Sequence, residues 1–293
     1  MYGECHAHML MNGRNYNEAV ELHKNQIQDP VIHEYFRRYQ EAGITFIRDG
    51  GDNLGVSQRA RDFAPEYGID YRSPIFAIHK NGYYGGIVGF GFDTIEEYAA
   101  LVKKVGELHG DFIKIMASGI LDFDEFGNVS TLLKDEALIH EMVHIAHEEG
   151  FSVMVHVNTP TQIRYALEAG CDSIEHGYYM DGECLRIMKE TGAVWVPTLA
   201  TCSSLRGCGR FNEEAVQKIT ASHMNNIRLA VEQGVHVATG SDAGAYLVPH
   251  AQGLMDEIRY LEEACGNDPE LVKKLHHTLD ESLQIIMDRF QRK

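Results

Sequence analysis

Histidine is the residue type in this sequence with the greatest capacity for chemistry. The chain of 293 residues contains 16 histidines, which is about twice the usual share for a soluble protein. Histidine is the commonest metal ligand and the general acid or base of neutral pH. His6 and His8 alternate in the sequence, so within a β-strand their side chains would point to the same face. The histidines therefore indicate metal binding or acid–base chemistry.

Four further polar side chains stand in or soon after short apolar runs, namely Lys114, His156, His176 and Asp242. Lys114 is flanked by apolar residues in Phe-Ile-Lys-Ile-Met, and a buried lysine without a partner is rare. Burial lowers the pKa of a lysine, and the neutral amine can then react with carbon dioxide. The resulting carbamate would be an anionic ligand with two oxygens, able to bridge two metal ions.

The elements that would position these side chains are short β-branched runs that alternate with longer amphipathic segments. Eight runs are predicted to be strands: Gly3–His8, Ile44–Arg48, Pro74–His79, Phe112–Met116, Ser152–Val157, Ser173–His176, Ala193–Pro197 and His236–Gly240. Strands that alternate with helices predict a parallel sheet, and eight such units in a chain of this length fit a (β/α)8 TIM barrel. An open doubly wound sheet is the alternative, although no glycine-rich turn of the dinucleotide-binding type supports it.

Helical periodicity is clearest in two segments between the strands. Apolar residues recur on one face of 134–149, and 212–233 opens with an Asn cap followed by acidic residues. The C-terminal stretch opens with Asn-Asp-Pro-Glu, which is typical of a capped helix with proline in its first turn. His140, His144 and His147 lie in the first of these helices, and we expect them at the surface because outer barrel helices are remote from the barrel mouth.

A TIM barrel would bring the candidate side chains together, because reactive groups sit at the carboxyl ends of its strands. The candidates come from five of the predicted strands and are His6, His8, Lys114, His156, His176 and Asp242. Polar groups buried there without partners would be costly, so a shared ion or function is the economical explanation. For each histidine taken alone, a satisfied position in the core is the alternative.

Composition and charge exclude several classes of partner. With 26 Lys and Arg against 43 Asp and Glu, the formal net charge is −17, which argues against a nucleic-acid binder and an electrostatic membrane anchor. There is no run of about 18 apolar residues that would predict a transmembrane helix. The start of the chain is neither basic nor followed by an apolar run, and the six cysteines show no CxxC spacing, so we expect a cytoplasmic protein with reduced thiols. The expected partner is a small-molecule substrate, and a homo-oligomer is left open.

Six motifs together resemble the amidohydrolase superfamily, in the branch that has a binuclear metal centre and a carboxylated lysine. They are Glu-Cys-His-Ala-His, Ile-Lys-Ile-Met-Ala-Ser-Gly, Val-Met-Val-His-Val, Ala-Gly-Cys-Asp-Ser-Ile-Glu-His-Gly, Val-Pro-Thr-Leu and Ala-Thr-Gly-Ser-Asp-Ala-Gly. They follow the family's order over residues 4 to 244. The prolidase-like members, which are related to imidazolonepropionase in their barrel, are the most similar. The resemblance implies a single metal-dependent hydrolase barrel domain over residues 1–293.

The resemblance also implies two divalent metal ions, most simply zinc, with iron, cobalt and manganese as alternatives. The implied ligands of the first ion are His6, His8, carboxylated Lys114 and Asp242, and those of the second are His156, His176 and the same carbamate. A hydroxide that bridges the ions would attack the substrate carbonyl, while Asp242 would accept its proton and pass it to the leaving nitrogen. The implied reaction is hydrolysis of an amide C–N bond in a peptide-like, N-acyl amino acid or cyclic amide substrate.

The sequence departs from the family pattern in three places. Glu4 replaces the usual Asp of the first motif and is interpreted as a supporting group, and the stretch from His79 to Tyr84 replaces a glycine-histidine-glycine turn. The His-x-His motif begins at residue 6 and the C-terminal stretch is helical. We therefore expect the barrel to lack the small β-sandwich domain of its relatives.

Substrate contacts are predicted in the stretches that follow three of the strands. The candidates are His79, Tyr83, Tyr178, Arg206 and Arg210. On an acidic protein, the arginines and His79 offer positive charge for an anionic substrate group, and the tyrosines could line a pocket. Solvated surface positions and ordinary packing are the alternatives for each of them.

Two other functions are left open by the sequence. A mononuclear deaminase or cyclic-imide hydrolase would use His6, His8, His156 and Asp242, with Lys114 unmodified. A metal-binding barrel that has lost catalysis would keep the same ligands without turnover. Two metal ions per chain would favour the bridging carbamate, whereas a single ion would favour the deaminase.

Overall fold

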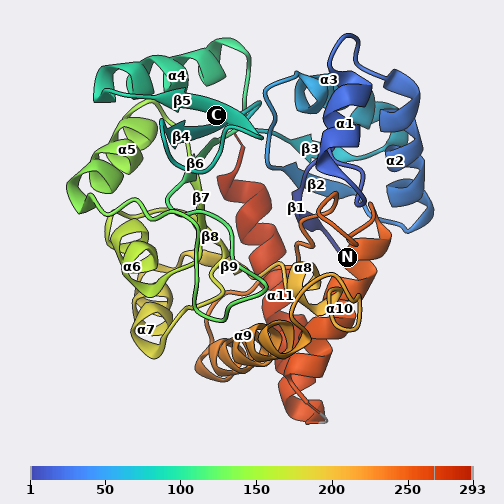
Figure 1. The fold of residues 1–293 in the computed structure, drawn as a ribbon, viewed down its shortest axis with the longest axis vertical. Helices are drawn as coiled ribbons and strands as arrows, with labels where there is room; N and C mark the ends of the chain where they lie inside the picture. The colour runs from blue at the N-terminus through green and yellow to red at the C-terminus, as the bar shows by residue number, and fades with distance from the viewer. Residues whose placement is uncertain (1, 267, 292–293) are drawn as a thin grey trace.

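The computed structural model describes residues 2–266 and 268–291 (Figure 1). Its strands are β1 (Glu4–Ala7), β2 (Phe46–Asp49), β3 (Asp70–Arg72), β4 (Ala77–Lys80), β5 (Gly89–Phe92), β6 (Ile113–Met116), β7 (Val153–Val157), β8 (Ser173–His176) and β9 (Val194–Val196). Its helices are α1 (Tyr16–His23), α2 (Asp29–Glu41), α3 (Val56–Phe63), α4 (Ile95–Glu107), α5 (Glu136–Glu148), α6 (Pro160–Glu168), α7 (Gly182–Thr191), α8 (Ala200–Ser203), α9 (Glu213–Gln233), α10 (Gln252–Ala264) and α11 (Pro269–Arg289), with a short 3-10 helix at Ala64–Tyr67. The predicted alternation of strands and helices is confirmed.

The paired strands are parallel and form two sheets, in the orders β1-β2-β3 and β5-β4-β6-β7-β8-β9. Backbone hydrogen bonds join the two sheets on both sides. Asp111 N donates to Ser73 O at 2.8 Å, which links the approach to β6 with the end of β3. On the other side, the segment 236–243 lies between β9 and β1. The chain therefore has an α/β fold of the TIM-barrel type, as predicted.

The segment 236–243 differs from the prediction of a regular strand over His236–Gly240. Only isolated bridges pair it with β9 and with the end of β1. Gly240 approaches β1 so closely that a Cβ atom there would lie 3.0 Å from His6 N. Asp242 then adopts a positive φ of 58°. This close approach and the turn that follows it interrupt the regular ladder, although the segment keeps its place between the two neighbouring strands.

The third predicted strand, Pro74–His79, is wrong at its start. Ile75 adopts a positive φ of 67°, so regular pairing begins only at Ala77 in β4. The residues before this turn form the separate strand β3, which pairs with β2. The sequence does not predict β5, because its Gly-Phe-Gly-Phe lacks β-branched residues; it pairs with the edge of β4 that faces away from β6.

Helices pack around the outside of the sheets, with α4 to α7 along one side and α1 to α3 along the other (Figure 1). The two helices predicted from periodicity are confirmed as α5 and α9. The cap of α9 is the predicted Asn212, whose side chain accepts from Glu214 N and Ala215 N. Asn267, the first residue of the other predicted capping stretch, lies outside the described residues. Asp268 caps α11.

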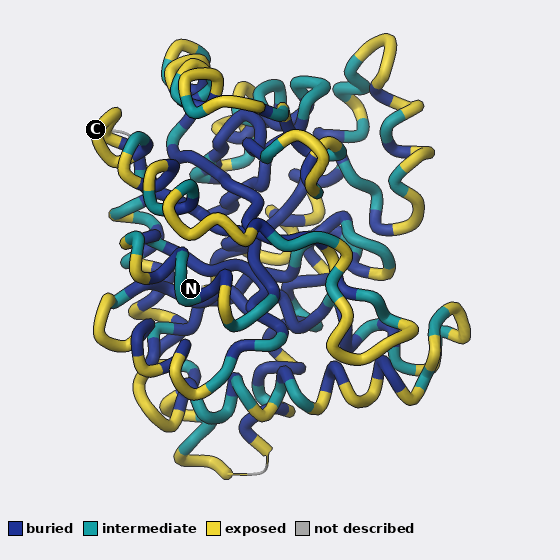
Figure 2. Tube along the Cα trace, turned by 60° about the vertical axis from the view of Figure 1, so that its left-hand side comes forward, coloured by how far each residue is buried: buried dark blue, intermediate teal, exposed yellow. Residues whose placement is uncertain are grey.

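Helix α11 covers the amino ends of the strands. Leu283 and Ile286 of this helix, and Phe290 at its end, pack with Phe46 and Phe112 at the starts of β2 and β6. Buried chain runs through the centre of the molecule, as Figure 2 shows. The opposite end of the barrel, formed by the carboxyl ends of the strands, is therefore the end at which a site can open.

All strands within the described residues belong to these two sheets. No helix in the same part of the chain combines the length and the apolar character needed to cross a membrane. The six cysteines are free. The extent of the domain, 1–293, stays a prediction.

Candidate metal centre

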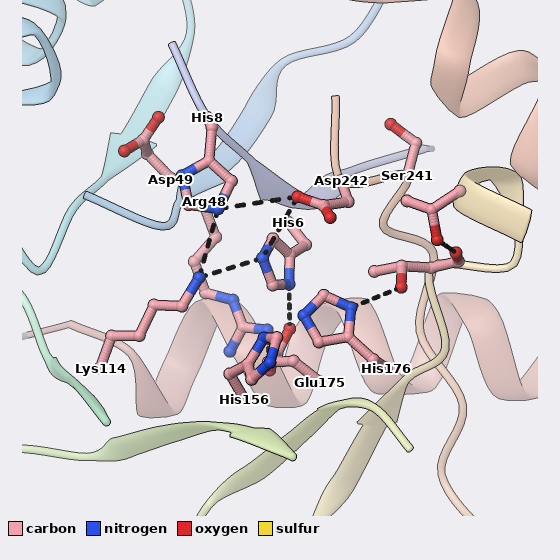
Figure 3. Close-up of polar contacts among 12 residues, drawn as sticks. His6, His8, Arg48, Asp49, Lys114, His156, Glu175, His176, Ser241 and Asp242 are labelled. Carbon is pink, nitrogen blue, oxygen red and sulfur yellow. Dashed lines mark hydrogen bonds and ion pairs between the residues drawn. The ribbon is translucent and has the colours of Figure 1, made fainter. Parts of the chain in front are cut away.

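The six predicted metal ligands converge at the carboxyl ends of the strands (Figure 3). They come from β1 and the residue that follows it, from β6, β7 and β8, and from the segment 236–243, and they are His6, His8, Lys114, His156, His176 and Asp242. The four histidines are at most 5% exposed, and Lys114 is 1% exposed. Elements that are distant in the sequence thus place six polar side chains in one enclosed group, which we call the ligand cluster.

Lys114 lies beside both histidines of the His-x-His motif. Its Nζ is 3.2 Å from His6 Nε2 and 3.3 Å from His8 Nε2. Asp242 Oδ1 lies 3.7 Å and 3.6 Å from the same two nitrogens. Potential ligand atoms of His6, His8 and Asp242 all lie within 4.8 Å of one another. These distances bring nitrogen and carboxylate donors to one point, as a bound cation requires.

His176 connects this group to the remaining histidine. Its ring centroid lies 4.9 Å from that of His6 and 4.4 Å from that of His156. Tyr84 packs on the outer side, with its ring 5.3 Å from the ring of His156. The cluster therefore extends from β1 to β8 as a continuous set of donors.

Hydrogen bonds at the far ring nitrogen orient two of the histidines. His6 Nδ1 bonds to Glu175 Oε2 at 2.7 Å, and His176 Nδ1 bonds to Thr198 Oγ1 at 2.7 Å. Both bonds leave Nε2 free to face the cluster. Histidines that bind metals usually have such a partner, which sets the tautomer and the ring orientation. The residues present therefore fit a divalent metal held by histidine and carboxylate ligands.

Burial sets the ionisation of the cluster. It lowers the pKa of His156 to about 3 and those of the other three histidines well below 6.5. It also lowers the pKa of Lys114 to about 8. Imidazole binds a metal in its neutral form, and a neutral lysine amine is the form that carbon dioxide can modify. The lowered pKa values of the histidines and the lowered pKa of Lys114 therefore both favour a metal centre.

Two of the predicted ligands adopt uncommon backbone conformations. His176 has a φ of 67° and Asp242 a φ of 58°. A positive φ is rare outside glycine, and residues held there cost on the order of 1–3 kcal/mol each. Such strain concentrates at functional sites, in agreement with the position of both residues in the cluster.

Two buried charged residues that the sequence did not predict, Glu175 and Arg48, hold His6 in place. The second oxygen of Glu175 accepts from Arg48 Nη2 at 2.7 Å. Arg48 also donates to Ser173 Oγ at 2.9 Å and to a carbonyl of β1 at 2.7 Å. Both charged residues are fully buried. Each is a charged residue within a predicted apolar strand, which is the same signal that identified Lys114.

Glu4 ties β1 to the loop that carries Asp242. Its Oε1 accepts from Ser241 N at 2.7 Å, and its Oε2 accepts from Ser241 Oγ at 2.6 Å. Burial raises the pKa of Glu4 to about 7. Glu4 therefore has the supporting position that was expected for it.

A cavity of about 230 Å³, partly open to solvent, adjoins the ligand cluster. Its lining includes five of the predicted ligands, His8, Lys114, His156, His176 and Asp242. Its other walls are mostly apolar or aromatic and include Met11, Tyr84, Leu121, Leu205, Phe211 and Tyr246. The site therefore combines a polar cluster with a predominantly apolar cavity, which is a common design for a small-molecule site.

Of the predicted substrate-binding residues, the structure places Tyr178 in the cavity lining. The hydroxyl group of Tyr178 bonds to Thr201, which also lines the cavity. Over the described part of the chain, the lining does not include the other four candidates, His79, Tyr83, Arg206 and Arg210.

The surroundings of three of these side chains explain why they do not line the cavity. His79 turns back on its own strand, because its Nδ1 bonds to Lys80 O at 3.0 Å. Arg206 forms two hydrogen bonds with Glu263, at 2.7 Å and 3.0 Å. Tyr83 is 40% exposed. Substrate contacts by these residues stay predictions without support from the geometry.

Comparison with known proteins identifies the family of this chain. The sequence matches the model of the Amidohydrolase family over residues 6–284. The chain belongs to the amidohydrolase family. Ochratoxinase of Aspergillus niger is 29% identical over 169 residues, which are 56% of this chain and 35% of that protein. An uncharacterized protein of Mycobacterium tuberculosis is 29% identical over 185 residues, which are 60% of this chain and 48% of that protein. The matches thus span half or less of these curated relatives.

Solved structures of amidohydrolases share the fold. A Xaa-Pro dipeptidase with bound methionine has a TM-score of 0.76 at 22% identity, covering 98% of this chain and 75% of that chain. Ochratoxinase of A. niger has a TM-score of 0.73 at 22% identity, covering 93% of this chain and 69% of that chain. A putative prolidase from Bifidobacterium longum has a TM-score of 0.73 at 20% identity, covering 98% and 69%. The architecture predicted from the sequence is therefore shared by known amidohydrolases.

Proposed function

We propose that this amidohydrolase is a metal-dependent enzyme that hydrolyses an amide C–N bond. The observation that carries the proposal is the convergence of four neutral histidines, a buried amine and a carboxylate beside a cavity. Membership of the amidohydrolase family and the similarity to ochratoxinase support hydrolysis as the reaction class. The proposed substrates are peptide-like compounds, N-acyl amino acids or cyclic amides.

The proposed cofactors are two divalent metal ions, most simply zinc, held by the six cluster residues with a carbamate on Lys114. The support for the carbamate is the position of the Lys114 amine, which is buried within 3.3 Å of the nitrogens of two candidate ligands. Bound divalent ions supply Lewis acidity toward a carbonyl oxygen and lower the pKa of a water molecule. His156 and His176 would complete the second set of ligands.

Asp242 is the proposed catalytic acid and base. Asp242 is the single acidic residue among the described residues that line the cavity. Its side chain is 18% exposed. It therefore borders both the ligand cluster and the substrate space. From this position its carboxylate would accept a proton from the attacking water and transfer it to the leaving nitrogen.

Metal analysis of purified protein tests this assignment. We expect two metal ions per chain and turnover of at least one member of a panel of dipeptides, N-acyl amino acids and cyclic amides. Lys114→Ala should lower the metal content and abolish turnover, because it removes the shared ligand. Lys103→Ala is the matched control, since Lys103 is an exposed lysine on α4. Retention of two ions and full activity by Lys114→Ala would show that the carbamate assignment is wrong.

Other outcomes would select the alternative functions. One ion per chain in an active enzyme would favour a mononuclear deaminase or cyclic-imide hydrolase. Bound metal with no turnover of amides, imides or amines would favour a barrel that has lost catalysis. The cytoplasmic location and self-association stay predictions from the sequence.

A further inference from the structure

The cavity beside the ligand cluster has few polar groups in its walls. Met11, Leu121 and Leu205 contribute aliphatic surface, and Tyr84, Phe211 and Tyr246 contribute aromatic surface. Among the described lining residues, Lys114 is the one lysine or arginine, and it lies within the cluster. A substrate carboxylate placed against these apolar walls, away from the cluster, would lose its hydration without meeting a cationic side chain, which is strongly unfavourable.

An arginine packs against two of these aromatic residues. The guanidinium carbon of Arg210 lies 4.4 Å from the ring centroid of Tyr246 and 5.1 Å from that of Phe211. Arg210 is exposed, and its guanidinium forms no ion pair with any residue that the structure describes. Arg206, four residues earlier, has its charge neutralised by Glu263. Arg210 is therefore an exposed guanidinium stacked on two of the residues that line the cavity, with its hydrogen-bond donors available.

We propose that the cavity takes an amphiphilic substrate, with an aromatic or other large apolar group next to the scissile amide and an anionic group at its outer end that Arg210 binds. The apolar group gains by burial against the cavity walls. The anionic group stays in water at the edge, where a guanidinium can bind a carboxylate through two parallel hydrogen bonds. A short dipeptide with two charged termini does not fit this arrangement of apolar walls and one outer guanidinium. The inference rests on the proposed amide hydrolysis for its reaction, but not for its binding site.

Binding of two dyes tests the site without catalysis. 8-Anilinonaphthalene-1-sulfonate combines aromatic rings with an anionic group, and N-phenyl-1-naphthylamine has the same rings without the anion. Arg210→Gln should weaken binding of the sulfonate dye by about tenfold relative to the neutral dye, because one charge-assisted contact is lost. Arg228→Gln is the control for overall charge, because Arg228 pairs with Glu232 on α9. An equal effect of the two arginine substitutions on the ratio of the dye affinities would overturn the role of Arg210.

Hydrolysis of matched amides tests the substrate class. 4-Carboxybenzanilide, whose carboxylate lies across an aromatic ring from the amide, should have a higher kcat/KM than both benzanilide and glycylglycine, and Arg210→Gln should raise KM for the carboxylated substrate more than it lowers kcat. Faster cleavage of glycylglycine would overturn the inference while leaving amide hydrolysis intact. Absence of all amide cleavage, together with the expected dye result, would uphold the binding site and overturn the proposed reaction.

Discussion

Histidine has opposite properties in two regions of this protein. In the ligand cluster, histidines are at most 5% exposed and burial lowers their pKa. On the outer helix α5, His147 is 38% exposed at its side chain, and the hydrogen bond that its ring donates to Asp172 raises its pKa. The first environment provides neutral nitrogen ligands, and the second favours a solvated imidazolium ion.

The difference shows that position in the fold, more than histidine content, decides the chemistry. In the cluster, Glu175 and Thr198 fix two of the rings so that their Nε2 atoms point to a common centre. His147 makes one contact across the surface, to Asp172 at 3.0 Å. Substitutions within the cluster should therefore have large effects on metal binding and catalysis, and a substitution on α5 should have a small effect on stability.

Replacement of the proposed catalytic carboxylate should have the largest effect. Asp242→Asn keeps the size of the side chain but removes its ability to accept a proton, so kcat should fall by roughly 10²–10⁴-fold. Steady-state kinetics on the best substrate of the panel provides the measurement, with circular dichroism to verify the fold. Turnover equal to that of the unsubstituted protein would remove Asp242 from the proton-transfer step.

Removal of the support beneath His6 should have the next largest effect. Arg48→Met leaves Glu175 buried without its ion-pair partner, so the free energy of unfolding should fall by about 3–5 kcal/mol. Metal affinity should fall roughly 10–100-fold, because His6 loses a fixed orientation. Denaturant unfolding and metal titration would measure the two effects.

An exposed arginine provides the control for that substitution. Arg186 pairs with Glu183 and Glu190 on the surface of α7, and Arg186→Met should leave the free energy of unfolding nearly unchanged, because exposed ion pairs contribute little. If the two variants were equally stable and bound metal equally well, the buried network would have no special role in the cluster.

The cluster could be predicted from the sequence because its members stand out in patterns that extend over only a few residues. Alternation within β1 places His6 near His8, and Lys114 is conspicuous as a charged residue in an apolar strand. Arg48 has the same signature in β2, but its partner Glu175 comes from β8, and only the fold shows that the two carry an ion pair. The same rules do not distinguish a strand from the irregular segment 236–243.

The cavity walls and the charged residues around them were harder to predict. Whether Arg206 faces a substrate or Glu263 depends on how the loop after β9 packs against α10, and these elements are more than 50 residues apart. The cation–π contacts of Arg210 depend in the same way on Tyr246, from another loop. Tertiary packing between loops, which no local pattern encodes, therefore decides which arginine keeps an available charge.

The smallest predicted effect lies on α5 and tests the other side of the comparison. Because the pKa of His147 is higher in the folded protein than in the unfolded chain, its contribution to stability is complete below the unfolded pKa and is lost as the pH rises through the folded pKa.

His147→Gln keeps a neutral hydrogen-bond donor but cannot gain the charge. The unsubstituted protein should therefore be more stable than the variant at about pH 5, and this difference should shrink toward pH 8. Solvent screening at this exposed site keeps the difference below about 1 kcal/mol. Denaturant unfolding at both pH values measures it, and a difference that is the same at both would show that protonation of His147 does not stabilise the fold.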